Sequence, residues 1–298
     1  MIRRMHWTVT PLAWRALVLA LLSFSTIECR VADSRVVTNS LFDPSSQAKE
    51  TPAESAAKLA AADPLAFLKH CLDNYDRTVS DYRCIFLKRE RMNDRVGEEQ
   101  EMAVLFREKP FSVDMRWIRN PGGATHVNYV EGRWNENGKE MAHIVPSGVL
   151  ALLAPNGVKR GIHAPDVLAA SRRSIDQFGF RSTLELIIKY SEMAQGQPGY
   201  EMHPRGIETF DGRSCYVFER KLPYTEPDEP YPDRTLMIYI DREWLVPLAC
   251  LAYADDARKE MLGSYVTRSI EFNVGLTDAD FDPHAPPSGA VTQAGSAR

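Results

Sequence analysis

Residues 111–117 read FSVDMRW, and this stretch has the clearest two-residue periodicity in the chain. Large apolar side chains occupy every second position, and Ser112, Asp114 and Arg116 lie between them. Successive side chains of a β-strand point to opposite faces, so the pattern predicts a strand with one apolar and one polar face. The apolar positions are Phe111, Val113, Met115 and Trp117.

Strand patterns flank this stretch on both sides. Residues 81–107 predict a long hairpin, and residues 200–272 hold several short alternating segments joined by turns. Apolar residues recur at helical spacing in 64–77 and 184–193, where Ser182 or Thr183 is the expected cap of the second helix. About nine strands and two helices predict an α+β fold built on an antiparallel sheet.

Two helices give little cover for so many strands. Residues 146–180 follow neither period and are expected to form loops and short helices across the open side of the sheet. The sheet should therefore curve strongly around the N-terminal and mid-chain helices, and some of its apolar surface should stay loosely covered.

The first 32 residues predict export. Arg3 and Arg4 precede the apolar run ALVLALLSF at 16–24, which is typical of a signal peptide and is short for a spanning helix. We therefore expect 1–32 to be removed and the protein to lie in the periplasm or cell envelope. An uncleaved membrane anchor is the alternative, and Cys29 is a candidate lipidation site.

The remaining chain divides by composition. Residues 33–62 are rich in Ala, Ser, Asp, Glu and Pro and predict a flexible linker, in which Ala53 to Ala61 could form a weak helical turn or two. Residues 284–298 predict a disordered tail. The folded domain is then 63–283. With 44% hydrophobic and 26% charged residues the chain is typical of a globular protein, and its net charge of -4 gives no reason to expect nucleic-acid binding.

Three phrases of the sequence, FREKPFSVDMRW (106–117), YIDREWLVPL (239–248) and NVGLTDADFDP (273–283), resemble a known family. The resemblance is to the bacterial secreted family catalogued as domain of unknown function 1571, and more widely to the LolA-type lipoprotein carriers. It implies an incomplete, strongly curved β-barrel whose helices cover the open side and which holds acyl chains, and it implies no catalytic residue.

The sequence lacks motifs for catalysis or metal binding. Its 7 histidines form no HExxH or similar spacing, and there is no CxxC, G-x-S-x-G, phosphate-binding loop or GxGxxG. A catalytic triad of His143, Ser147 and an Asp can be imagined, but a chain with 7 histidines and many aspartates offers such a combination by chance. We therefore expect no catalytic residue, no metal site and no cofactor.

Four cysteines remain beyond the signal region. Cys71 falls near the end of the first helix and Cys84 near the start of the first strand, so their Cα atoms could approach to about 6 Å, the usual disulfide separation. We expect a Cys71–Cys84 disulfide, and a Cys215–Cys250 pair is less favoured. The alternative is four buried free thiols.

The apolar face of the sheet suggests the function. In an open barrel its side chains would line a pocket for an acyl chain, and in a closed one they would be ordinary core. We expect a non-enzymatic envelope protein that binds a lipid, lipoprotein or other hydrophobic ligand, peripheral to or tethered at the membrane. The alternatives are a structural or sensory interaction domain with a filled core and, less favoured, a secreted hydrolase; the oligomeric state is not indicated. The expected pocket residues are Phe111, Val113, Met115, Trp117, Tyr129, Val217, Ile238 and Ile240.

Overall fold

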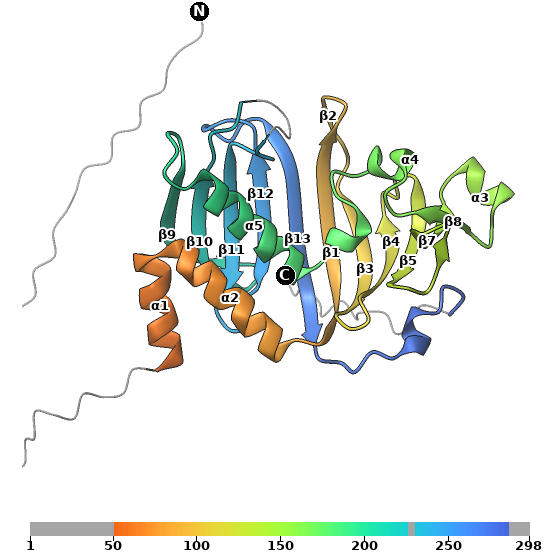
Figure 1. Cartoon of the computed structure of the whole chain (residues 1–298), viewed down its shortest axis with the longest axis horizontal. Coiled ribbons are helices and arrows are strands. Elements are labelled where there is room, and N and C mark those ends of the chain that lie inside the picture. The colour runs from red at the N-terminus through yellow and green to blue at the C-terminus, as the bar shows by residue number, and fades with distance from the viewer. Residues whose placement is uncertain (1–50, 226–229, 286–298) are drawn as a thin grey trace, which may run out of the picture. The chain divides into compact units, whose positions relative to one another are not determined.

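The computed structural model describes residues 51–225 and 230–285. The expected signal peptide, Cys29 and most of the expected tail lie outside these residues. The expected α+β class is confirmed: one curved, antiparallel sheet of 13 strands carries helices on one side (Figure 1).

The elements follow in chain order. The helices are α1 (Pro52–Ala62), α2 (Pro64–Thr78), α3 (Val149–Leu153), α4 (Pro165–Leu168), the 3-10 helix η1 (Ile175–Gln177), α5 (Phe180–Ala194) and the 3-10 helix η2 (Asp278–Phe281). The strands are β1 (Asp81–Met92), β2 (Arg95–Val96), β3 (Gln100–Arg107), β4 (Ser112–Arg119), β5 (Ala124–Val130), β6 (Asn135–Glu136), β7 (Lys139–Pro146), β8 (Val158–Gly161), β9 (Glu201–Phe210), β10 (Arg213–Lys221), β11 (Thr235–Asp241), β12 (Pro247–Tyr253) and β13 (Met261–Phe272).

The sheet is open rather than a closed barrel. Its strands run in the order β6-β7-β5-β4-β3-β1-β13-β12-β11-β10-β9, and the end strands β6 and β9 do not pair with each other. The count exceeds the expected nine mainly through β2, β6 and β8, which have 2, 2 and 4 residues and are too short to show a period in the sequence.

Strand β4 has the two faces that FSVDMRW predicted, and the expected strand through 112–116 is confirmed. Val113 pairs with Phe106 of β3 and Tyr129 of β5, whereas Asp114 pairs with Asn128 of β5. Directly opposed residues of antiparallel strands point to the same face, so the apolar positions align across strands. This alignment builds the apolar concave face.

Helices α2 and α5 cover only part of that face. Figure 1 shows them lying across the half of the sheet from β9 to β13. Phe67 of α2 is fully buried, and its ring centroid lies 5.1 Å from that of Tyr216 and 5.4 Å from that of Phe218, both in β10. The part of the sheet around β10, under α2, is therefore filled core.

Helix α5 starts earlier than expected. Its N-cap is Gly179 rather than Ser182 or Thr183, because the chain turns into the helix with a φ of 108° at Gly179. A side chain there would also meet Phe106, whose ring lies 2.9 Å from the position of an added Cβ. Glycine alone suits both conditions.

Part of the expected linker is helical. Thr51 and Glu54 form a capping box at the start of α1, and Ala56 and Ala60 are buried against the helical core. The alanine-rich composition of this segment indicated flexibility. In the structure the alanines favour a helix, and their small side chains let its buried face pack closely against the core.

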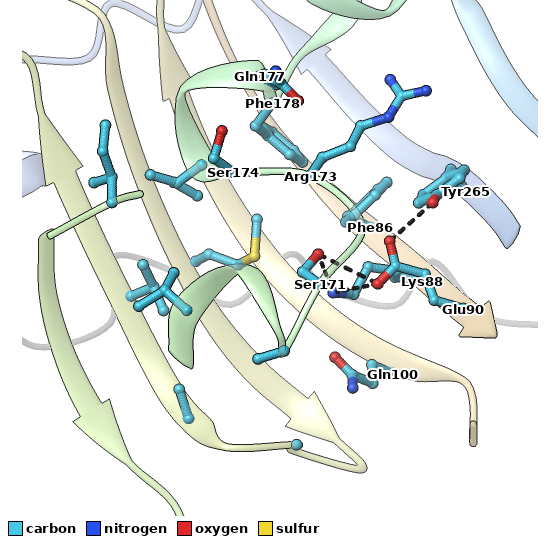
Figure 2. A pocket seen from close by; sticks show the side chains of 18 of the residues that line it. Phe86, Lys88, Glu90, Gln100, Ser171, Arg173, Ser174, Gln177, Phe178 and Tyr265 are labelled. Atoms are coloured by element: carbon cyan, nitrogen blue, oxygen red, sulfur yellow. Dashed lines mark hydrogen bonds and ion pairs between the residues drawn. The ribbon is translucent and has the colours of Figure 1, made fainter. Parts of the chain in front are cut away.

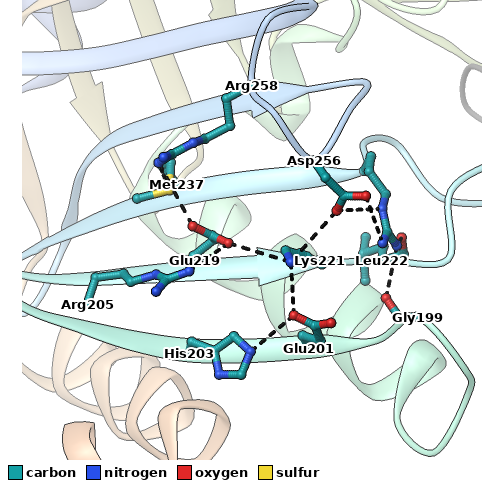
Figure 3. A network of polar contacts seen from close by, with 11 residues as sticks. Gly199, Glu201, His203, Arg205, Glu219, Lys221, Leu222, Met237, Asp256 and Arg258 are labelled. Carbon is teal, nitrogen blue, oxygen red and sulfur yellow. Dashed lines mark hydrogen bonds and ion pairs between the residues drawn. The ribbon is translucent and has the colours of Figure 1, made fainter.

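The outer face at the β9 edge is highly charged. Lys221 Nζ lies 3.0 Å from Glu201 Oε2, and Arg205 Nη2 lies 2.9 Å from Glu219 Oε1 (Figure 3). Charged side chains and a proline such as Pro204 discourage pairing with another strand at an exposed edge. We interpret this network as protection of the edge.

The expected Cys71–Cys84 disulfide is not formed. Cys71, Cys84, Cys215 and Cys250 are all free and buried. Cys71 belongs to the core under the helices and Cys84 to the neighbouring cluster around Phe106, so each packs as a small apolar side chain.

The polar face of β4 carries a buried charge cluster on the outer side of the sheet. The Asp114 carboxylate accepts hydrogen bonds from His126 Nε2 at 2.6 Å, Asn128 Nδ2 at 2.7 Å and Arg116 Nε at 2.9 Å. Arg116 also donates to the carbonyl of Ala285 at 3.0 Å, which holds the segment after β13 against this face.

The Asp114 carboxylate is stabilised in its charged form. Burial alone would raise its pKa, but the hydrogen bonds from His126 and Asn128 and the charge of Arg116 outweigh burial and lower the pKa of Asp114. A lowered folded-state pKa contributes stability above the unfolded pKa of about 3.9, and this contribution disappears as the pH falls through the folded value.

We therefore expect Asp114→Asn to lower the free energy of unfolding at pH 7 by about 1.5–3 kcal/mol, the value of hydrogen bonds to a charged group. The difference from wild type should shrink as the pH falls below about 4. Urea unfolding at pH 7 and pH 3 measures both effects. The control is Glu136→Gln, at an exposed position of β6; a gap that stays constant down to pH 2 would contradict the account.

Candidate binding cavity

A cavity of ≈ 690 Å³ lies between the concave face of the sheet and the crossover segment, which we define as residues 147–179. Its lining runs from Leu236 of β11 and Cys250 of β12 across β13 and β1 to Val127 of β5 and Ile144 of β7. Cavities of about 300–1,000 Å³ are typical of sites for small molecules. The space between the sheet and the crossover segment is therefore not filled.

The cavity wall is largely apolar. Phe86, Met115 and Trp117 line it from the sheet, while Ile175 and Phe178 line it from the crossover segment. The rings of Phe86 and Phe178 meet edge to face with centroids 5.1 Å apart, which fixes the crossover segment to β1. The wall suits a ligand with a hydrocarbon part.

One buried carboxylate ties the crossover segment to the sheet. Glu90 of β1 is 7% exposed and accepts hydrogen bonds from Tyr265 Oη at 2.9 Å and from Ser171 Oγ at 3.3 Å (Figure 2). Lys88 Nζ lies 3.2 Å from Glu90 and donates to Ser171 at 3.1 Å. Burial and the Glu90 charge raise the pKa of Tyr265, so its hydroxyl remains a donor.

Each carboxylate in the lining has a cationic partner. Lys88 pairs with Glu90, and Arg160 pairs with Asp166. Asp233 accepts from Arg220 Nη2 at 2.9 Å through both oxygens, and both side chains are buried. The cations of the lining are Lys88, Lys159, Arg160 and Arg173, so Lys159 and Arg173 have no carboxylate of the lining as partner.

The structure separates the residues expected in the pocket. Met115 and Trp117 line the cavity, and the Trp117 indole donates to Gln100 Oε1 at 3.0 Å. Phe111, Val113 and Tyr129 lie beside it in packed clusters.

The other three expected residues lie elsewhere in the sheet. Ile238 and Ile240 pack in the filled core with Phe67. Val217 pairs with Tyr239, whereas its neighbours in β10 pair with Ile238 and Ile240, so Val217 points to the opposite face. The alternation in β10 was correct, but only the register with β11 decides which side of it is concave.

The sequence interpretation missed several lining residues. Phe86, Lys88 and Glu90 follow one another at every second position of β1, so a change from apolar to charged residues along one face was visible. Ile175 and Phe178 follow no period and could not be assigned to the cavity.

The cavity offers no recognisable catalytic group among the residues that the structure describes. No histidine lines it, and no cluster of His, Cys, Asp or Glu over the described ranges could hold a metal ion. The Ser171 hydroxyl is engaged by Glu90 and Lys88, as described above.

An exposed apolar tip lies at one end of the cavity. Val149, Leu152 and Leu153 of α3 are 77%, 81% and 80% exposed, and the adjacent Leu150 lines the cavity. Clustered exposed apolar side chains mark interaction surfaces. Over residues 51–225 and 230–285, no helix is long and apolar enough to span a membrane.

Comparison with known families supports the sequence resemblance. Residues 79–289 match the family described as "Protein of unknown function (DUF1571)". This chain belongs to the DUF1571 family. No curated protein matches this DUF1571 chain.

Solved structures show low similarity to this DUF1571 protein. The MucA/MucB complex of Pseudomonas aeruginosa aligns with a TM-score of 0.42 and 14% identity, over 74% of this chain and 60% of that chain. The Mycobacterium tuberculosis lipoprotein LppX aligns with a TM-score of 0.36 and 14% identity, over 72% of this chain and 99% of that chain. A putative outer membrane lipoprotein-sorting protein domain from Vibrio parahaemolyticus aligns with a TM-score of 0.34 and 12% identity, over 73% of this chain and 95% of that chain. At these scores the similarities say nothing about a ligand of this chain.

We expect Glu90→Gln to loosen the crossover segment, because a neutral amide is a weaker acceptor for Tyr265 and Ser171 and no longer pairs with Lys88. Amide hydrogen exchange in residues 171–178 should speed up by about tenfold or more, measured by mass spectrometry. The control is Glu101→Gln in β3, which pairs with Arg119 and Arg268 rather than with the crossover segment. Equal acceleration in the two variants would contradict the anchoring role.

Proposed function

We propose that this chain is an exported, non-enzymatic protein of the cell envelope that binds a lipid, lipoprotein or other hydrophobic ligand in the cavity. The predicted export signal supports the location. The observation that carries the proposal is the ≈ 690 Å³ cavity with a largely apolar wall, since a core of this size would otherwise be closely packed.

The alternatives have less support. A structural or sensory interaction domain was expected to have a filled core, and the region under the crossover segment is not filled. A hydrolase would need a nucleophile and a base, or two free carboxylates, converging in the cavity. Among the described residues the lining carboxylates all have cationic partners.

The exposed tip suggests how a ligand enters. Leu150 and Val158 are 61% and 42% exposed and also line the cavity, so the cavity reaches the surface beside α3. Lys159 and Arg160 follow directly in β8. We propose that this apolar and basic tip contacts an anionic membrane surface, where a lipid could pass into the cavity.

The first test is binding of a fluorescent fatty-acid probe by the purified domain. Wild type should bind the probe, and Trp117→Ala should weaken binding about tenfold because it removes a large part of the apolar wall. Val127→Trp, which fills the cavity from β5, should also weaken it. The matched control is Ile118→Ala, the next residue of β4, which is 57% exposed and does not line the cavity.

Two outcomes would count against this function. Wild-type protein that binds no probe would refute ligand binding in the cavity. Trp117→Ala that leaves binding unchanged but lowers stability by about 3–5 kcal/mol would make Trp117 an ordinary core residue.

The second test concerns the tip. Combined Leu152→Asp and Leu153→Asp substitutions should reduce flotation with vesicles of phosphatidylglycerol by about tenfold or more, since burial of each leucine contributes about 1.5–3 kcal/mol. The control is Ile207→Asp in β9, which is 54% exposed near the other edge of the sheet. Equal flotation of all three proteins would exclude membrane contact through the tip.

A further inference from the structure

Arg173 is a cation of the cavity wall that has no carboxylate partner among the residues the structure describes. Its side chain extends from the crossover segment toward the strand that carries Tyr265, and its guanidinium carbon lies 5.8 Å from the centroid of that ring (Figure 2). It makes no hydrogen bond or ion pair with any residue in 51–225 and 230–285. It is half-buried, so water solvates it only in part.

The nearby carboxylates do not supply the missing partner. Glu90 is engaged by Tyr265, Ser171 and Lys88, and Asp233 is engaged by the buried Arg220. The cavity therefore has a local positive charge at Arg173. Arg173 and Cys250 both line the cavity, so this charge lies at the cavity wall. Burial raises the pKa of the Cys250 thiol to about 12, and the Arg173 charge opposes that rise.

An uncompensated, half-buried guanidinium is well suited to an anion. Its planar donors match a carboxylate with two parallel hydrogen bonds, and low polarity around the pair strengthens it. A single guanidinium balances one negative charge. Phe86 of the sheet and Phe178 of the crossover segment also line the cavity, and Met115 and Trp117 extend the apolar surface toward β4.

We propose that the cavity binds an ionised fatty acid, with its carboxylate paired to Arg173 and its hydrocarbon chain against Phe86, Met115 and Trp117. This inference rests on the proposed function, because it names the ligand class for the same cavity.

The test compares two ligands that differ only at the polar end. Delipidated protein is titrated with oleate and with oleyl alcohol by isothermal titration calorimetry. Wild type should bind oleate about tenfold or more tightly than the alcohol, a difference of ~1.4 kcal/mol. Arg173→Gln should lose this preference by weakening oleate alone, and Arg173→Lys should keep part of it. Lys139→Gln, which removes the same charge from an exposed position of β7 that does not line the cavity, should change either affinity by less than about twofold.

The outcomes separate the two proposals. Equal affinities of wild type for oleate and the alcohol would overturn recognition of a carboxylate and leave hydrophobic binding in place. Equal losses in Arg173→Gln and Lys139→Gln would overturn the specific role of Arg173. Binding of neither ligand by wild type would refute the proposed function itself.

A spectroscopic measurement covers the case in which Arg173→Gln fails to fold. Oleate labelled with ¹³C at the carboxyl carbon is titrated by NMR while bound to wild-type protein. Pairing with Arg173 should hold the pKa of the bound carboxyl below that of oleate in neutral detergent micelles, because a nearby cation favours the charged form. A pKa equal to or above the micelle value would overturn the proposal.

Discussion

The concave face of the sheet has more apolar surface than the helices of this fold can cover. Helices α2 and α5 lie across the half from β9 to β13, where Phe67 and Ile238 belong to a filled core. Beyond them the cover is the crossover segment, whose helices have 5, 4 and 3 residues. Such short elements cannot fill the space under a curved sheet as a long amphipathic helix does. The cavity lies where the regular helical cover ends.

The crossover segment is held by a few specific contacts rather than by a continuous core. Phe178 meets Phe86 edge to face, and Ser171 donates to the buried Glu90. The same segment places Arg173 against the cavity. One short stretch of the crossover segment therefore both anchors that segment to the sheet and carries the side chain proposed to bind an anion. Glu90 of β1 is already engaged by Tyr265, whereas the Arg173 guanidinium is available for a ligand.

Strand β4 links the two sides of the sheet. Met115 and Trp117 face the cavity, while Asp114 and Arg116 face the polar cluster that holds the segment after β13. Because neighbouring residues of a strand point to opposite faces, the backbone of one strand positions both sets. The polar cluster therefore supports the cavity wall from behind.

The sequence by itself determined the elements whose period is strong: β4 from FSVDMRW, helix α2 from 64–77, the strand after the turn at Asp211 and the α+β class. It also indicated an apolar face with too little helical cover. Tertiary structure alone decided that Val217 points away from Ile238, because a shift of one residue in strand register exchanges the faces. It also decided that Ile175, Phe178 and Arg173 meet the cavity, since an aperiodic segment takes its path from long-range contacts such as those of Glu90 and Phe86. Likewise Cys71 and Cys84 entered separate packed clusters, because the packing of the helix on the sheet, and not their spacing in the chain, sets where each side chain points.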